Sequence, residues 1–307
     1  MTTEAQVGPS TEQGAAPSRR IFRYSAWDAV PAVMVYLHLG LLAVFFLVWP
    51  QLNWPLRLAG GTLYAMAIGW NQDSVAHNFI HNPFFTSRLA NRITALALTL
   101  ENGTPQTMYR WVHMRHHAGN SDRPGADGKT IDPISIYAHG ANGNAEPMMP
   151  YVLMGFWRDD GPFTVARQIR ARRPDEARQA LQEFWLLMAV VGLLFLLRWD
   201  FVLVMAPFYY LGQSLSFLIA YYEHLGADPE TPIASGVSTY GRLYNWAFLN
   251  NGFHAEHHFR PTQHWTAMAA LRKEAGVAQA AAGVRVLRRA HFLGFLDPQT
   301  WRVPTGR

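Results

Sequence analysis

The sequence predicts an all-α integral membrane protein with four transmembrane helices, arranged as two hairpins, and a helical cap on the cytoplasmic side. Two observations lead to this fold class. Half of the 307 residues are hydrophobic and only 15% are charged, whereas about 25% of the residues of an ordinary soluble domain are charged. The hydrophobic residues also gather in long runs, and a run of about 20 residues is enough to cross a bilayer.

The predicted spans form two pairs, each of which returns the chain to the side from which it started. A short turn between Pro50 and Pro55 joins the first pair, and the second pair meets near Arg198 and Asp200. The second span becomes polar towards its end, from Asn71 onward. The four spans are predicted at about residues 30–49, 56–76, 184–199 and 201–222.

The arginines near the start of the chain predict its orientation. Arg19, Arg20 and Arg23 stand just before the first apolar run, and basic residues beside a span favour the cytoplasm. Both termini are therefore predicted to be cytoplasmic in a multi-pass protein. Residues 1–20 are predicted to be a disordered tail that lacks the features of a signal peptide, and residues 21–307 to form one membrane domain.

The composition also excludes several kinds of function. The chain has no cysteine, which excludes disulfides, thiolate zinc sites and iron–sulfur clusters of its own. One-electron chemistry would therefore need electrons from another protein. The net charge of +5 is carried almost wholly by arginine, and in so apolar a chain we interpret it as membrane orientation rather than as a sign of a nucleic-acid partner.

Eight of the thirteen histidines fall into three clusters with helical spacing. Side chains at positions i, i+3 and i+4 share one face of a helix, so each cluster can direct its imidazoles the same way. A ninth candidate, His224, stands where the fourth span ends. The clusters are His77 and His81; His113, His116 and His117; and His254, His257 and His258.

These histidines predict a site for two metal ions within the cytoplasmic cap. The clusters lie at the ends of the predicted spans or beyond them, so the predicted topology places all three on one side of the membrane. A neutral imidazole is a good ligand for zinc, copper, iron or nickel. A zinc site uses three or four protein ligands, so eight clustered imidazoles are too many for one tetrahedral ion. The residues alone leave the identity of the metal open.

The three clusters resemble the histidine boxes of the membrane fatty acid desaturase family. The order His77-x-x-x-His81, His113-x-x-His116-His117 and His254-x-x-His257-His258 is similar to that family's pattern. The segments Asn251–Pro261 and Tyr222-Glu223-His224 resemble its third box and the short segment upstream that supplies an extra histidine ligand. Asn120 and Asp132-Pro133 resemble the residues that follow the second box. The resemblance covers about residues 70–265.

The resemblance implies a non-haem di-iron centre, made of two iron ions, that activates dioxygen and oxidises an unactivated C–H bond of a fatty acyl or lipid chain. Nine histidines would be the metal ligands: His77, His81, His113, His116, His117, His224, His254, His257 and His258. Electrons would come from a separate ferredoxin, rubredoxin or cytochrome b5-like donor and its reductase. The expected reaction is desaturation.

Two alternatives to a desaturase stay open at this stage. The first box has three intervening residues where the acyl-CoA Δ9 branch typically has four, and no cytochrome b5-like domain is recognisable. Both features argue against that branch, and a hydroxylase or a ketolase acting on an alkane, acyl or isoprenoid substrate remains an alternative. An alternative of another class is a haem-binding or metal-binding membrane protein without oxygenase activity.

Three polar residues beside the boxes are candidates for orienting the imidazoles through their second nitrogen, as metal-bound histidines require. Asp73 lies one helical turn before His77, Asn251 lies three residues before His254, and Glu256 lies within the third box. Asp127 and Asp132 could form salt bridges with the arginines of the boxes, but they are interpreted as residues that cap a loop. The other histidines are interpreted as structural: His38 lies in the first span and is expected to have no polar companions, and His139, His264 and His291 have no partner at ligand spacing.

Overall fold

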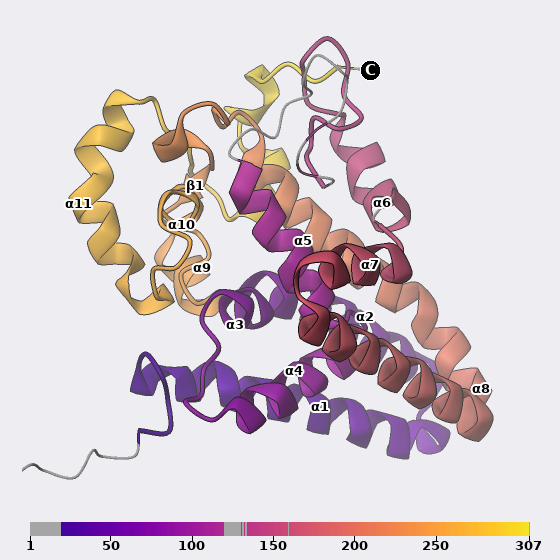
Figure 1. Ribbon diagram of the computed structural model, residues 1–307. Coiled ribbons are helices and arrows are strands. Elements are labelled where there is room, and N and C mark those ends of the chain that lie inside the picture. Colours follow the sequence, from indigo (N-terminus) through magenta and orange to yellow (C-terminus); the bar gives the residue numbers. More distant parts are fainter. Residues whose placement is uncertain (1–19, 120–129, 131, 133, 159, 307) are drawn as a thin grey trace, which may run out of the picture.

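The computed structural model describes residues 20–119, 130, 132, 134–158 and 160–306, and it is mostly helical (Figure 1). Most of the predicted tail, residues 1–19, lies outside this part. The α-helices are α1 (Ala29–Val48), α2 (Trp54–Asn71), α3 (His77–His81), α4 (Arg88–Asn102), α5 (Gln106–Gly119), α6 (Met148–Arg158), α7 (Pro162–Arg172), α8 (Pro174–His224), α9 (Arg242–Ala247), α10 (His254–Phe259) and α11 (Met268–Ala281). The strands β1 (Ser238–Thr239) and β2 (Val286–Leu287) pair in parallel.

Short helices of other types connect these elements. A π-helix, η3 (Gln72–Ala76), continues α2 directly into α3. The 3-10 helices are η1 (Ala26–Asp28), η2 (Trp49–Gln51), η4 (Pro232–Ala234), η5 (Trp265–Ala267), η6 (His291–Leu296) and η7 (Thr300–Arg302). Because a π-helix has one more residue per hydrogen-bonded turn than an α-helix, η3 changes the direction in which the side chains of α3 point.

Two helical segments of the described chain are long and apolar enough to cross a membrane, Ala26–Gln51 and Pro174–His224. Many of their large apolar side chains are exposed: Leu41 and Leu47 on α1 and Leu196 on α8 are 59%, 66% and 84% exposed. Such surfaces are unfavourable in water and suit contact with lipid. The predicted span at 56–76 corresponds to α2 and η3, which are not among these two segments, so the arrangement of four spans stays a prediction.

The long helix α8 is broken at Arg198. The backbone of this residue is not helical (φ −154°, ψ 76°), and in Figure 1 the chain after the break runs back alongside the first arm. The two arms correspond to the two apolar runs of the sequence. At the break, the indole of Trp49 donates a hydrogen bond to the carboxylate of Asp200 over 2.6 Å, so the end of α1 lies against the turn within α8.

The second arm of α8 packs closely on α2, and this contact positions two of the histidine-bearing segments. Small residues allow the two backbones to approach. A Cβ atom on Gly212 would lie 2.7 Å from Cβ of Ile68 and 2.9 Å from the carbonyl oxygen of Ala65, and a Cβ on Gly69 would lie 2.9 Å from Cβ of Leu215. Since His77 follows α2 and His224 ends α8, the close packing fixes their separation.

A buried polar network crosses the helices near this contact. His38 Nδ1 lies 3.2 Å from a carboxylate oxygen of Glu101, and Asn71 donates to the other oxygen over 3.0 Å. Asn102 in turn donates to Asn71 over 3.0 Å, and its carbonyl accepts from Gln213 over 2.9 Å. The expectation that His38 lacks polar companions was therefore wrong, because its partners come from α2 and α4 rather than from its own helix.

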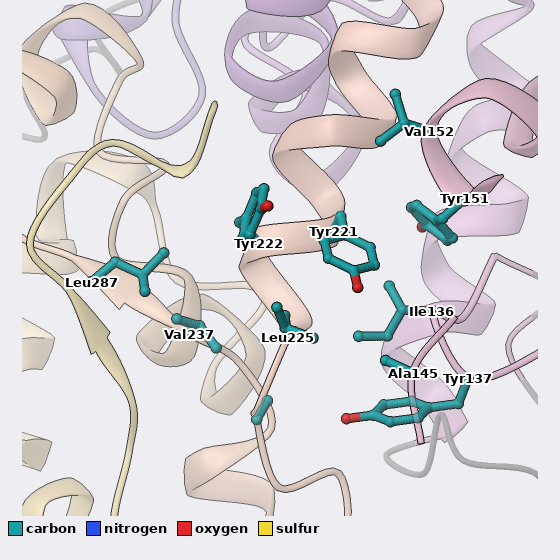
Figure 2. Close-up of a cluster of buried hydrophobic side chains, with 11 residues drawn as sticks. Ile136, Tyr137, Ala145, Tyr151, Val152, Tyr221, Tyr222, Leu225, Val237 and Leu287 are labelled. Carbon is teal, nitrogen blue, oxygen red and sulfur yellow. The ribbon is translucent and has the colours of Figure 1, made fainter. Parts of the chain in front are cut away.

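The C-terminal part of the chain closes over the end of α8 that carries His224. Tyr221, Tyr222 and Leu225 at the end of α8 form a buried cluster with side chains from the loop before α6, from α6, from the residue before β1 and from β2 (Figure 2). Gly294 in η6 lies so close to Tyr222 that a Cβ there would be 2.3 Å from the ring. The segment that carries His224 is therefore held from two sides.

We expect Gly212→Val to destabilise the protein and to lower its metal content. The added carbons would force α2 and α8 apart, and overpacking of this kind costs about 1–3 kcal/mol. Gly192→Val on the first arm of the same helix is the control, because no described atom outside the local helix backbone lies within 4 Å of a Cβ at Gly192. Thermal unfolding in detergent and metal analysis measure both effects, and equal melting temperatures for the two variants would contradict the role given to the α2–α8 contact.

Candidate metal centre

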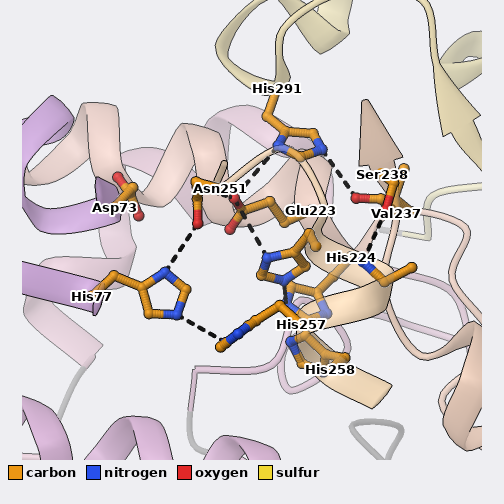
Figure 3. A network of polar contacts seen from close by, with 12 residues as sticks. Asp73, His77, Glu223, His224, Val237, Ser238, Asn251, His257, His258 and His291 are labelled. Carbon is orange, nitrogen blue, oxygen red and sulfur yellow. Dashed lines mark hydrogen bonds and ion pairs between the residues drawn. The ribbon is translucent and has the colours of Figure 1, made fainter. Parts of the chain in front are cut away.

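The structure brings all nine predicted histidines into one interior region. They come from α3, α5, the end of α8 and α10, elements that are far apart in the sequence. Figure 3 shows four of them, His77, His224, His257 and His258. Two groups have nitrogen atoms close enough together to share an ion. The first is His77, His81, His113, His117 and His257, and the second is His116, His224 and His258. His254 lies beside the second group, with its Nε2 3.1 Å from Nε2 of His224.

The nitrogens of the first group converge on one another. Nε2 of His257 lies 3.0 Å from Nε2 of His77 and 3.0 Å from Nε2 of His117, which is 2.9 Å from Nε2 of His113. An imidazole nitrogen carries either one hydrogen or one lone pair, so hydrogen bonds cannot satisfy such a chain of contacts. Two nitrogens bound at right angles to one metal, each about 2.1 Å from it, are about 3.0 Å apart. The spacing therefore fits a shared ion.

The polar contacts of His77 define which of its nitrogens faces the group. Asn251 donates from Nδ2 to Glu223 over 2.6 Å, so its Oδ1 must face the ring of His77, whose Nδ1 is 3.0 Å away. Nδ1 of His77 therefore carries the hydrogen and donates it to Asn251. Nε2 is left with a free lone pair directed at the other imidazoles, which is the form that binds a metal.

His81 also has a nitrogen that no hydrogen bond satisfies. Its buried Nε2 has no hydrogen-bond partner among the residues that the structure describes. A buried nitrogen without a partner is costly in a protein interior. A metal ion bound by the first group would satisfy it.

The second group is arranged similarly around an acidic residue. Nδ1 of His116 lies 2.6 Å from a carboxylate oxygen of Asp132, and its Nε2 is 3.1 Å from Nε2 of His258. The carboxylate holds the hydrogen of His116 on Nδ1 and so directs the lone pair of Nε2 at the group. Nδ1 of His254 lies 3.6 Å from Glu223.

Burial keeps these imidazoles neutral at neutral pH. Removal from water, followed by the neighbouring imidazoles, holds the pKa of His113, His257 and His258 well below the usual value of 6.5. The same causes lower the pKa of His117 and His254. Neutral imidazole is the form that ligates a metal, so these side chains are in the binding form without a change of protonation.

A family model described as fatty acid desaturase matches residues 52–289 of the chain. The chain belongs to the fatty acid desaturase family. No curated protein sequence matches it. The match includes all nine histidines of the centre, so the family and the geometry agree on a site that can hold metal. Their role as ligands in this desaturase-family protein stays a prediction.

Of the three polar residues that the sequence suggested for orienting the imidazoles, only one contacts a histidine ring through its side chain. Asn251 contacts a histidine ring, as expected. Oδ1 of Asp73 accepts a hydrogen bond from Ser216 over 3.1 Å, and its carboxylate makes no hydrogen bond to a described imidazole. Glu256 accepts hydrogen bonds of 2.8 Å from Ser238 and Tyr240. It therefore anchors α10 to the segment at β1 and does not orient a ring.

Sequence reasoning missed three residues that support the centre. Asp132 was interpreted as a loop residue, but its carboxylate binds His116. Glu223 connects both groups, because it accepts from Asn251 and faces His254. His291 was interpreted as a tail residue without a partner, but it is fully buried with Nδ1 3.4 Å from Glu223 and Nε2 3.0 Å from the carbonyl of Val237. Two of the three carried a signal: Glu223 through its place beside His224, and Asp132 through its resemblance to the residues that follow the second box. Asn120, Asp127 and Pro133 lie outside the described residues.

A cavity of about 400 Å³ opens beside the two groups. Histidines of both groups line it, together with side chains of α5, α7 and both arms of α8. Among its lining residues are Met108, Val112, Val165, Phe184, Leu187 and Met188. A mostly apolar cavity with polar groups at one place is the usual form of a site for an organic substrate.

We expect Asp132→Leu to weaken metal binding by about 10–100-fold, the usual effect of removing a partner of a ligand's second nitrogen. Asp132→Asn keeps an oxygen that can accept from His116 and should retain most of the metal. Asp175→Leu, on the exposed start of α8, is the matched control. The measurement is metal per chain after dialysis against a chelator, and undiminished retention in Asp132→Leu would argue against this role.

Proposed function

We propose that the protein is a membrane di-iron oxidoreductase that uses dioxygen and external electrons to desaturate a fatty acyl or lipid chain. The observation that carries the proposal is the convergence of nine imidazoles into two adjacent groups in a chain of the fatty acid desaturase family. Each group would hold one ion. The number of groups supports two ions, and the family supports iron.

The chemistry supplied by the bound iron would be the activation of dioxygen for cleavage of an unactivated C–H bond. All the proposed ligands are neutral, so they leave the ions more electron-poor than carboxylate ligands would. The chain's own residues then have three tasks. Asn251 and Asp132 hold two of the rings in the binding form, the cavity places a substrate carbon beside both groups, and its apolar wall limits access of water.

The proposed reaction balances with electrons from another protein. One substrate chain loses two hydrogen atoms to form a double bond, and two electrons and two protons from outside complete the reduction of dioxygen to two waters. The chain has no cysteine, so no redox centre based on thiols can supply the electrons. The donor is proposed to be a ferredoxin, a rubredoxin or a cytochrome b5-like protein with its reductase. It would bind on the cytoplasmic side, where we place the histidines and both termini.

A hydroxylase or ketolase of the same family is the second candidate function. Its proposed metal centre would be the same, and the outcome would differ in whether the substrate loses a second hydrogen or gains oxygen. Haem or metal binding without oxygenase activity is the candidate of another class. The described histidines approach one another rather than facing an open plane, which favours separate ions over a haem.

The test is expression in a lipid-producing host with donor proteins, followed by mass spectrometry of the lipids. We expect a loss of two mass units in a lipid chain, and we expect His113→Ala and His258→Ala to abolish it while leaving the protein in the membrane. His139→Ala is the control, because this histidine is exposed and belongs to neither group. A gain of sixteen mass units would indicate hydroxylation instead.

Metal analysis of the purified protein tests the proposed cofactor independently. We expect about two iron ions per chain. One zinc ion with no iron, or a strong Soret absorption band, would contradict the di-iron proposal. Full activity in both histidine variants would mean that the clusters are not the active site.

A further inference from the structure

The cavity beside the metal centre reaches the surface between the start of α7 and the first arm of α8. Nearly all of its described lining residues are buried or half-buried. Among them, only Gly161, directly before α7, and Met188, on the first arm of α8, are exposed. Met188 is 40% exposed. In the part of the chain that the structure describes, these two residues therefore mark the mouth of the cavity.

The mouth lies at a level that we predict to be within the bilayer. Met188 belongs to the predicted span at residues 184–199, and its neighbour Trp185 on the same arm is 58% exposed. Phe163 in the first turn of α7 lies against this arm, with its ring centroid 5.4 Å from that of Phe184 and 6.1 Å from that of Trp185. Exposed aromatic and apolar side chains of this kind suit contact with lipid, so lipid chains rather than water would surround the mouth.

Helix α7 leads from this mouth away from the predicted core of the bilayer. It packs along the start of α8 (Figure 1). The two helices share a buried cluster that includes Val165, Ala166, Ile169, Ala177 and Ala180. Because only Arg173 separates α7 from Pro174, the first residue of α8, the end of α7 is level with the start of α8. That start lies ten residues before the predicted span, or about 15 Å along a helix.

The outer face of α7 is basic. Arg167 and Arg170 are exposed, and residues 162–173 include no aspartate or glutamate. The two arginines follow Phe163 by four and seven residues, so they lie on its face of the helix but further from the predicted span. A helix with an aromatic side chain at the level of the lipid chains and arginines further out fits the headgroup region of an anionic leaflet.

We propose that the cavity takes its substrate chain sideways from the cytoplasmic leaflet, while Arg167 and Arg170 bind the phosphate of an anionic lipid headgroup. The substrate is then an acyl chain of a membrane phospholipid, not one carried in water. The inference rests on the proposed function for the word substrate, but it concerns where a chain binds. Gly161 at the mouth precedes Arg167 by six residues, or about 9 Å along a helix, so one lipid can bring its phosphate to the arginines and its chain to the mouth.

A photoreactive lipid tests this route without turnover. The full-length protein in nanodiscs of phosphatidylcholine, kept free of oxygen and reductant, receives phosphatidylglycerol with a diazirine in one acyl chain. After irradiation, mass spectrometry locates the adducts, and we expect them on buried cavity residues such as Met108 and Val165. Two further probes carry the same photoreactive chain: a diacylglycerol without phosphate, and a coenzyme A thioester whose phosphates lie in water. Both should label the cavity about fivefold or more weakly.

A variant at the mouth tests the point of entry. Met188→Trp places a larger side chain at the mouth and should lower the labelling of the cavity by phosphatidylglycerol. Leu196→Trp is the matched control, because Leu196 lies on the same arm, is 84% exposed and does not line the cavity. Its labelling should equal that of the unchanged protein.

Variants of the arginines test the headgroup contact. Arg167→Gln combined with Arg170→Gln should lower the labelling by phosphatidylglycerol to the level of the diacylglycerol, and should leave the labelling by the diacylglycerol unchanged. Arg288→Gln combined with Arg289→Gln is the matched control, since both arginines are exposed and lie outside α7. This control should keep the preference for phosphatidylglycerol.

Three outcomes would overturn the inference. The first is labelling of the cavity by the thioester that equals or exceeds labelling by phosphatidylglycerol, which would mean that the chain enters from water. The second is undiminished labelling in Met188→Trp, and the third is an undiminished preference for phosphatidylglycerol in the variant of both α7 arginines, each with an unchanged elution volume. Because no electrons are supplied, these outcomes do not depend on oxidation of a lipid. Desaturation of a water-borne thioester would overturn this inference and leave the proposed function intact.

Discussion

The constraint on which the structure depends is the close approach of imidazole nitrogens in a buried region. Successive Nε2 atoms of His77, His257, His117 and His113 are 2.9–3.0 Å apart, which hydrogen bonds alone cannot satisfy. A cation between the rings would satisfy these nitrogens, provided that each ring is held in one tautomer. Acceptors behind the rings provide this second condition: the amide oxygen of Asn251 for His77 and the carboxylate of Asp132 for His116.

Those acceptors have to come from elements that the fold brings in from elsewhere. Asn251 follows α9, and it is itself oriented by Glu223 at the end of α8. His291 of η6 then faces Glu223, so the C-terminal segment contributes to a chain of contacts that ends at His77. The tight packing of η6 on Tyr222 is part of the same arrangement, because it fixes the end of α8. A shift of any one of these segments would move a ring of the centre.

Sequence reasoning predicted the features that depend on residues close together in the sequence, and it missed contacts between residues that are far apart in the sequence. Spacing within one helix was enough to find the three clusters, since residues such as His113 and His117 share a face through local geometry. The break in α8 near Arg198 was also predictable from the sequence, because charged residues interrupt an apolar run there. The match to the desaturase family confirms the resemblance. The four spans and their orientation remain predictions, with two suitable helices in the described residues.

The residues that sequence reasoning missed act over long separations. Asp132 and His116 are 16 residues apart, and His291 and Glu223 are 68 residues apart. Nothing in the local pattern distinguishes such residues from a loop aspartate or a tail histidine. The same limitation explains His38, whose partners Glu101 and Asn71 lie on other helices. Hydrophobic periodicity predicts which face of a helix is buried, but it does not predict which polar groups of other helices will meet it.

Four acidic residues lie around the two groups of imidazoles, and three of them are bound by neighbouring side chains. Asp132 is bound to His116, Glu223 to Asn251, and Glu256 to Ser238 and Tyr240. Asp73 differs from these three, because Ser216 holds one oxygen while the other is buried without a hydrogen-bond partner among the described residues. If the two groups hold ions, the three bound carboxylates would partly balance their positive charge at a distance, which a set of neutral ligands cannot do by itself.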